Sequence, residues 1–395
     1  MSPEEVPTFD VSALERDLNA LRDELRGDVS AADLDHLRRV ERLGRLCTAV
    51  GWATAWVAPN PLAVAGISTG VVARWTMIAH HVTHRGYDKV PGVPARLTSK
   101  TFARGWRRLV DWMDLLHPEA WRHEHNTLHH YKLGEVHDPD QPEHNLDWLR
   151  TSPLPVWARF VVLLIGALTW RWMYYPPNTM RELYEHELRR SKAPRTFHVL
   201  DPRVYLPLTR PGRDTWLRCW LPYLLVHFVL LPLPFLLVSP WAYGSVLVNR
   251  ILAEFLANLH TFLIIVPSHA GEDIYRFDEP IKGRGDFYLR QIIGSANYRT
   301  GGFLNDFLHG WLNYQIEHHL WPDLTMRQYA RAQPRVQEIC ARHGVPYVQE
   351  SVWIRLRKLV RVLVGVDTMK RWSTPQSEAL VVELRGAEPA RDAVA

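Results

Sequence analysis

The sequence predicts an all-α integral membrane protein, in which four transmembrane helices form two hairpins capped by a cytosolic helical domain that holds a metal site. Long apolar runs, of which residues 216–238 are the strongest, and 17 tryptophans among 395 residues predict the membrane part. The mean hydropathy of only -0.20 requires that much of the chain lies outside the bilayer. Histidines that recur in three clusters predict the metal site.

Residues 1–43 are expected to form a cytosolic amphipathic segment. The acidic start lacks the basic region and apolar core of a signal peptide, so the N-terminus should remain in the cytoplasm. Between residues 11 and 43, leucines recur at spacings of three and four among charged residues, which is the pattern of a helix with one apolar face. We expect this helix to pack on the cytosolic domain or to lie along the membrane surface.

Residues 44–79 are predicted to form the first transmembrane hairpin. The apolar run is broken at Pro59-Asn60-Pro61, which suits a tight turn between two antiparallel spans. The first span, residues 46–58, is shorter than the about 20 residues that a crossing needs, so its flanks must extend it or the bilayer must thin locally. The second span, residues 61–79, ends directly at His80.

Residues 80–215 are predicted to lie in the cytosol. A cluster of lysine and arginine between residues 96 and 108 is typical of the cytoplasmic side of a membrane protein. The run at residues 154–175 is apolar enough to span. If it crossed, however, His269 would lie on the opposite side of the membrane from the other histidine clusters, so we interpret the run as an interfacial or re-entrant helix.

Residues 216–268 are predicted to form the second hairpin, with prolines as kinks. Arg250 and Glu254 are four residues apart inside its second span, where an unpaired charge would cost at least ~2.5 kcal/mol. We expect them to form an ion pair that faces other helices; the alternative is that they line a substrate channel.

The rest of the chain is predicted to be a cytosolic cap and a C-terminal extension. Residues 269–346 carry the third histidine cluster in a helical region. Residues 347–395 combine a basic amphipathic segment at 352–363, which can lie on the membrane, with a polar tail from residue 373 that is expected to be disordered.

Charge and cysteine usage exclude several classes of protein. The net charge of +5 comes mostly from scattered arginines, which fit anionic lipid headgroups better than nucleic acid, and no compact basic-aromatic module is visible. Cys47, Cys219 and Cys340 are far apart and form no Cys-x-x-Cys, which argues against a disulfide scaffold, a zinc ribbon and a fused rubredoxin. We expect them to be free thiols.

The three histidine clusters favour a metal centre over buried polar helix turns, which would explain any one cluster alone. Residues four apart share a helix face, so each cluster can present two groups to one ion: His80 with His84, His125 with His129, and Gln315 with His319. The adjacent His130 and His318 point roughly 100° away and can serve a second ion. Imidazole suits iron, copper, nickel or zinc, and a dinuclear iron site is the economical interpretation.

The motifs around these histidines resemble the membrane fatty acid desaturase family, particularly its acyl-lipid and front-end branch. The resemblance covers roughly residues 45–365 and rests on three motifs in order. They are His80-His81-Val82-Thr83-His84, then Trp121-Arg122-His123-Glu124-His125-Asn126-Thr127-Leu128-His129-His130, and then Asn313-Tyr314-Gln315-Ile316-Glu317-His318-His319-Leu320-Trp321-Pro322. A lone histidine just after the last span is a further family feature, which His269 matches.

The resemblance implies a di-iron site whose ligands are His80, His84, His125, His129, His130, His269, His318 and His319. Gln315 is either a further ligand or a hydrogen-bond partner, because an amide oxygen binds iron less well than an imidazole. In some family members a polar residue one turn before the lone histidine assists the site, but here that position is Ile265. Carboxylates that can hold the outer nitrogens of the ligands are Glu124, Asp138, Asp140 and Glu317; the alternative is that they form a solvated polar face.

The activity that the resemblance implies is that of an O2-dependent desaturase, which introduces a cis double bond into a fatty acyl chain carried by lipid, CoA or acyl carrier protein. Because no side-chain base can remove hydrogen from an unactivated methylene, the metal centre must supply the oxidant from O2 and two electrons. The haem signature of a fused cytochrome b5 is not visible, so we expect a separate ferredoxin or flavoprotein reductase as electron donor. Hydroxylation and acetylenation on the same scaffold stay open.

A membrane metal-binding or transport protein without redox chemistry is the alternative from another class. It would place its metal-binding residues at mid-membrane depth. Here the histidine clusters are predicted to lie outside the spans, on the cytoplasmic side of a cytoplasmic membrane that the chain crosses several times. This placement favours the enzyme.

Overall fold

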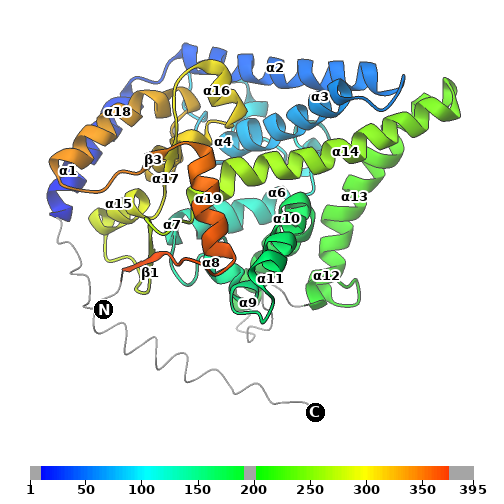
Figure 1. The fold of residues 1–395 in the computed structure, drawn as a ribbon. Helices are drawn as coiled ribbons and strands as arrows, with labels where there is room; N and C mark the ends of the chain where they lie inside the picture. Colours follow the sequence, from blue (N-terminus) through cyan, green and yellow to red (C-terminus); the bar gives the residue numbers. More distant parts are fainter. Residues whose placement is uncertain (1–9, 191–201, 373–395) are drawn as a thin grey trace.

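The structure is a computed structural model that describes residues 10–190 and 202–372. The described chain is mostly helical, as predicted (Figure 1). Two short parallel strand pairs add to the helices: β1 (Tyr275–Phe277) pairs with β4 (Lys370–Trp372), and β2 (Asn297–Tyr298) pairs with β3 (Gln349–Glu350). These pairs attach the C-terminal part of the described chain to loops that precede and follow α15 (Arg284–Ile293). The predicted disordered tail from residue 373 lies outside the described residues.

The predicted amphipathic segment consists of two helices, α1 (Val11–Gly27) and α2 (Ala31–Ala55). The leucines that recur along α1 are its buried residues: Leu14, Leu18, Leu21 and Leu25. A capping box formed by Ser30 and Asp33 starts α2. Because α2 continues without a break into the apolar stretch, the second part of the amphipathic segment and most of the predicted first span belong to one helix.

α2 packs along a second long helix, which begins as α3 (Pro61–Val72), continues through a π-helical segment (Ala73–Ala79) and ends as α4 (His80–Thr83). Two glycines allow the close approach of the helices. A Cβ atom at Gly51 would lie 2.6 Å from the Ile67 nitrogen, and one at Gly66 would lie 2.6 Å from the Cys47 carbonyl oxygen. Small residues at such contacts are typical of helices that pack in membranes.

A further pair of helical arms lies beside the first (Figure 1). Its first arm is irregular, because prolines remove backbone donors; it consists of α12 (Arg210–Thr215), a π-helical segment (Trp216–Trp220), α13 (Leu221–Leu224), a second π-helical segment (Leu225–Leu230) and a 3-10 turn (Leu233–Leu237). Its second arm is α14 (Pro240–Ile265). Ser245 and Asn249 of α14 donate to the Ala55 carbonyl at 2.6 and 2.9 Å, so α14 meets the turn that joins α2 to α3.

Four helical stretches in the described chain are long and apolar enough to cross a membrane: Pro61–Thr83, Val156–Met173, Arg210–Leu237 and Pro240–Ser268. The number agrees with the prediction, but the set differs. The stretch Val156–Met173 is α10, which we interpreted as interfacial or re-entrant from the sequence. Residues 46–58 are not in the set, because they fall at the end of α2, whose earlier turns carry many charges.

Arg250 and Glu254 form the expected ion pair, at 2.5 Å. The pair is part of a larger buried group, the Glu254 network, which joins α10, α13, α14 and the loop before α6 (Pro118–His123). Its members are Asp114, Arg171, Tyr223, Arg250 and Glu254. The network fastens α10 to α14, and so it helps to position the part of α10 that borders the candidate site.

Short helices between the long ones build the rest of the molecule. They are α5 (Arg108–Asp111), α6 (Pro118–His123), a π-helical segment (Glu124–His129), α7 (His130–Lys132), α8 (Pro142–Asn145), α9 (Asp147–Arg150), α11 (Tyr175–Arg190), α16 (Phe303–Leu308), α17 (Gln315–Leu320), α18 (Met326–Arg342) and α19 (Val352–Leu363). Every residue of α17 is buried, with α15 and α18 packed against it. The third histidine motif therefore lies in the core.

Candidate metal centre

The structure brings the predicted histidines together in one buried region. They come from four places in the fold: α4 and the residue after it, the π-helical segment before α7 together with the first residue of α7, the residue that follows the 3-10 turn after α14, and α17. Their ligand nitrogens form two groups, in each of which the atoms lie within 4.8 Å of one another. The first group is His80, His84, His125, His130 and His318, and the second is His129, His269 and His319.

The doubled histidines are divided between the two groups, as their spacing predicted. His130 and His318 belong to the first group, whereas His129 and His319 belong to the second. Adjacent residues on a helix point about 100° apart, so the two rings of each doublet can reach different ions. The division supports two neighbouring ions rather than one.

The partner of His125 differs from the prediction. We expected it to share an ion with His129, but it groups with His130, and the two Nε2 atoms are 3.3 Å apart. The segment Glu124–His129 is π-helical, and π-helices have i→i+5 hydrogen bonds, so residues five apart rather than four line up. His125 and His129 do meet in a third, smaller cluster with Asp140.

Hydrogen-bond acceptors hold the outer nitrogen of each histidine in the second group. The three hydrogen bonds run from His129 Nδ1 to Asp138 (2.9 Å), from His269 Nδ1 to the Ile265 carbonyl (2.9 Å) and from His319 Nδ1 to the Gln291 amide oxygen (3.1 Å). Because each acceptor receives a hydrogen bond from Nδ1–H, the proton of each neutral ring stays on Nδ1 and the Nε2 atom keeps its lone pair. The second group therefore presents three lone pairs to one point.

In the first group, a tyrosine holds the outer nitrogen of His318. The Tyr329 hydroxyl donates to the Pro322 carbonyl at 3.2 Å, so its oxygen is free to accept from His318 Nδ1 at 3.1 Å. Among the described residues, His84 Nε2 and His318 Nε2 are buried without any hydrogen-bond partner. Buried polar atoms are rarely left unpaired, so these nitrogens point to a ligand.

The spacing of the nitrogens fits metal ligands. Nε2 of His80 and Nε2 of His125 are 2.8 Å apart, and Nε2 of His269 and Nε2 of His319 are 3.1 Å apart. Two metal–nitrogen bonds of about 2.1 Å at right angles place the nitrogens about 3 Å apart. Five imidazoles in the first group also exceed the four ligands of a structural zinc site. The first group therefore suits a higher-coordinate ion better than tetrahedral zinc.

Burial favours neutral imidazoles, the form that binds metal. Desolvation lowers the pKa well below its usual value, with further lowering by neighbouring imidazoles, in His84, His125, His130, His318 and His319. His129 differs. Burial alone would lower its pKa, but the Asp138 carboxylate raises the pKa of His129 above its usual value.

Gln315 lies beside the second group. Its Nε2 is 3.1 Å from Nε2 of His269, while its Oε1 is buried without a partner among the described residues. Rotation of the amide by half a turn would exchange the two atoms and direct the oxygen at the second group. Because that group has three histidines, it leaves room for an oxygen ligand of this kind.

The other predicted carboxylates have different partners. Asp138 holds His129, but Glu124 accepts from Asn178 at 3.1 Å, and Asp140 accepts from the Tyr174 hydroxyl at 2.7 Å. Glu317 accepts from two groups, Asn297 Nδ2 and the Tyr347 hydroxyl, both at 2.8 Å. Burial raises the pKa of Glu317 to about 7, although these hydrogen bonds oppose the shift.

Several residues of the site could not be identified from the sequence. Gln291 lies 28 positions before its partner His319, and no local pattern marks it. Tyr329 is one of many tyrosines in the sequence. Trp121 stacks on His125, with ring centroids 4.2 Å apart and planes 18° apart, and its place at the start of the second motif was the one available signal.

Histidines outside the two groups have other contacts. The His81 ring lies 5.7 Å from the His318 ring, and the His123 ring lies 4.3 Å from that of His186. His260 and His309 form hydrogen bonds with the backbone carbonyls of Leu308 and Asn305. In the described chain, none of these four belongs to a group that could hold an ion.

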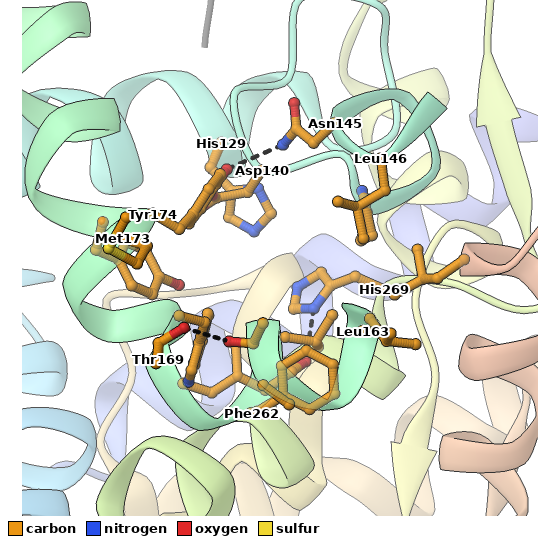
Figure 2. A pocket seen from close by; sticks show the side chains of 18 of the residues that line it. His129, Asp140, Asn145, Leu146, Leu163, Thr169, Met173, Tyr174, Phe262 and His269 are labelled. Atoms are coloured by element: carbon orange, nitrogen blue, oxygen red, sulfur yellow. Dashed lines mark hydrogen bonds between the residues drawn. The ribbon is translucent and has the colours of Figure 1, made fainter. Parts of the chain in front are cut away.

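An apolar cavity of about 270 Å³ adjoins the histidines. His80, His125, His129 and His269 line it at one end, and α10 lines it along much of one side. Figure 2 shows His129 and His269 directed toward the cavity, with Tyr174 on one side and Leu146 and Leu163 on the other. The arrangement can hold an apolar chain with one stretch of it next to the candidate metal site.

Comparison with known proteins identifies a family. The family model for fatty acid desaturases matches residues 51–351. A stearoyl-CoA 9-desaturase of Mycobacterium tuberculosis that depends on NADPH is 25% identical over 378 residues, which cover 91% of this chain and 80% of the relative.

Two further relatives match a shorter part of the chain. A Delta(8)-fatty-acid desaturase of Euglena gracilis is 30% identical over 262 residues, which cover 62% of this chain and 56% of the relative. An acyl-lipid (9-3)-desaturase of Physcomitrium patens is 25% identical over 264 residues, which cover 62% of this chain and 43% of the relative.

Proposed function

The chain belongs to the fatty acid desaturase family, and we propose that it desaturates a fatty acyl chain at a di-iron site built from its two histidine groups. Family membership and the desaturase relatives make the protein an oxidoreductase of lipid metabolism. They also favour an enzyme over the metal-binding or transport protein without redox chemistry that we considered from the sequence.

The observation that carries the proposal is the convergence of two groups of buried imidazole nitrogens at the end of an apolar cavity. We assign one iron ion to the first group and a second to the second group. Their ligands would be His80, His84, His125, His130 and His318 for one ion, and His129, His269 and His319, with Gln315 as an oxygen ligand, for the other.

The proposed reaction takes two vicinal hydrogens from the acyl chain, and with O2, two electrons and two protons it yields a cis double bond and two waters. When bound, the iron ions would supply the oxidising power that side chains lack. The protein's part is to position the chain: the walls of the cavity hold two methylenes near His129 and His269 and exclude water from them.

The site is proposed to face the cytoplasm, with the α2–α3 and α13–α14 pairs as hairpins in the membrane. The contacts of Ser245 and Asn249 with Ala55 support this arrangement, because they place the turns of both pairs at one end of the molecule. Electrons would come from a separate ferredoxin or flavoprotein reductase. The name of the mycobacterial relative indicates NADPH as the source of electrons for that protein.

Lipid mass spectrometry tests the proposal. Cells that express the protein together with a reductase should contain acyl chains that have lost two hydrogens, and the product should disappear in the His125→Ala variant. Purified protein should contain about two iron ions per chain. Chains that gain one oxygen would instead identify a hydroxylase, chains with a triple bond an acetylenase, and zinc without O2 consumption would contradict the proposal.

A further inference from the structure

The cavity reaches the surface along α10. Leu163, Ala167 and Trp170 line it from the buried face of that helix, whereas Gly166 and Met173 line it and are exposed. Gly166 contributes no side chain to the rim, and a Cβ atom there would meet no atom within 4 Å. The wall that α10 forms is therefore open near Gly166.

The surface outside this opening is apolar. Val161, Leu164 and Ile165, on the outward face of α10, expose between 48% and 58% of their surface. Apolar side chains rarely cluster in this way on a surface that faces water. α10 is also one of the stretches that are apolar enough to lie in a membrane. The opening therefore faces hydrocarbon.

No lysine or arginine is among the described residues that line the cavity. Among the described residues that line the cavity, Asp140 and the histidines are the titratable groups besides tyrosine. Arg150 of α9, and Arg159 and Arg171 within α10, are all engaged, Arg171 with Asp114 at 2.9 Å. Arg150 pairs with Glu143 at 2.7 Å, and Arg159 donates to the carbonyls of Ser152 at 2.7 Å and Val364 at 3.0 Å. A thioester carrier with several phosphates would need free arginine or lysine side chains near the mouth of the cavity.

We propose that the cavity takes its acyl chain sideways from the bilayer, through an opening beside Gly166, so that the substrate is an acyl chain esterified in a membrane glycerolipid. The part of this inference that concerns the reaction product rests on the proposed desaturase function, whereas the part that concerns lipid binding does not. Binding can therefore be tested without iron.

Photo-crosslinking tests the opening. Full-length protein in phosphatidylcholine vesicles that contain a phospholipid with a diazirine in its acyl chain should be labelled on the buried residues of α10 that line the cavity: Leu163, Ala167 and Trp170. The label on these residues should fall at least fivefold in Gly166→Trp, which fills the opening, and should persist in Gly166→Ala and in the outward-facing control Leu164→Trp. Equal labelling of Gly166→Trp and the wild-type protein would overturn the proposal.

A competition assay tests the carrier. The iron-loaded protein, with a reductase, is given deuterated stearoyl-phosphatidylcholine in the vesicles and stearoyl-CoA with a different deuterium label in solution. Desaturation of the phospholipid at least tenfold faster supports the proposal, whereas preferential use of the thioester overturns it. If neither substrate is desaturated, the proposed function is contradicted. The crosslinking result alone then shows whether an acyl chain enters the cavity beside Gly166.

Discussion

The histidine groups and the Glu254 network are both buried, but their polar atoms have different partners. In the Glu254 network opposite charges meet within the protein: Arg171 binds Asp114 at 2.9 Å, and Arg250 binds Glu254 at 2.5 Å. In the histidine groups, by contrast, like nitrogens face one another, and His84 Nε2 and His318 Nε2 have no described partner. Closely spaced lone pairs repel one another unless a cation lies between them.

The comparison shows how a buried polar region that stabilises the fold differs from one that binds a metal. Burial alone does not distinguish the two regions, because both lie almost entirely out of solvent. What distinguishes them is the charge that faces each group: in the Glu254 network arginines face carboxylates, whereas in the histidine groups imidazoles face one another. We therefore expect substitutions in the Glu254 network to change stability, and substitutions in the histidine groups to change metal binding.

The largest expected effect is that of His318→Ala, which removes a ligand from the middle of the first group. Desaturation and the iron of that group should be lost, because the remaining imidazoles no longer enclose the ion. Elemental mass spectrometry measures the iron content, and lipid mass spectrometry measures the desaturated product. The control is His309→Ala, which removes a histidine bonded to the Asn305 carbonyl and should keep both. Full activity of His318→Ala would contradict a metal-binding role for the first histidine group.

The next effect is on stability. Glu254→Ala leaves Arg250 buried without its carboxylate, and removal of one partner of a buried pair costs roughly 3–5 kcal/mol. We expect a marked fall in Tm in detergent, with iron still bound below the transition. Glu187→Ala breaks the exposed pair with Arg210 and should cost no more than about 1 kcal/mol. A Glu254→Ala protein of normal Tm that has lost its iron would assign this network to the metal site.

An intermediate effect is expected from Asp138→Asn. The amide can still accept from His129 Nδ1, but it lacks the charge that orients the ring and makes it a stronger ligand. Iron affinity should fall about 10–100-fold. Tm should fall less than in Glu254→Ala, because the amide loses only the acceptor of the Gly134 N–H. Titration with a competing chelator measures the affinity, and the exposed Asp147→Asn serves as the control. A large loss of Tm with unchanged iron affinity would show that Asp138 stabilises the fold rather than the metal site.

The last effect concerns Glu317, whose folded-state pKa of about 7 lies above its usual value of 4.5 because of burial. A raised pKa means that the folded state binds the proton more tightly, so stability is present below pH 4.5 and falls as the pH rises to about 7. Glu317→Gln cannot titrate. In the apo-protein, the Tm of the variant relative to wild type should rise between pH 4.5 and 7 and then level off. A constant difference would show that this carboxyl is not shifted.

Local sequence was enough to predict the residue types of the site and much of the helical fold. The three motifs and His269 predicted every histidine of the two groups, because a metal site needs ligands of a given chemistry at spacings that one helix face can present. The doublets at His129 and His318 predicted two ions, since adjacent rings must diverge. The leucine spacing in α1 likewise predicted the face that is buried.

Tertiary structure decided how these parts combine. The π-helical turn at Glu124–His129 pairs His125 with His130 rather than His129, and such a turn does not follow from helical spacing. The acceptors Gln291 and Tyr329 lie on α15 and α18, so their roles depend on packing against α17. The cavity beside α10 also exists because that helix packs on α14, a contact between segments about 90 residues apart. The sequence by itself determined which ligands are available, whereas long-range packing decided which of them meet.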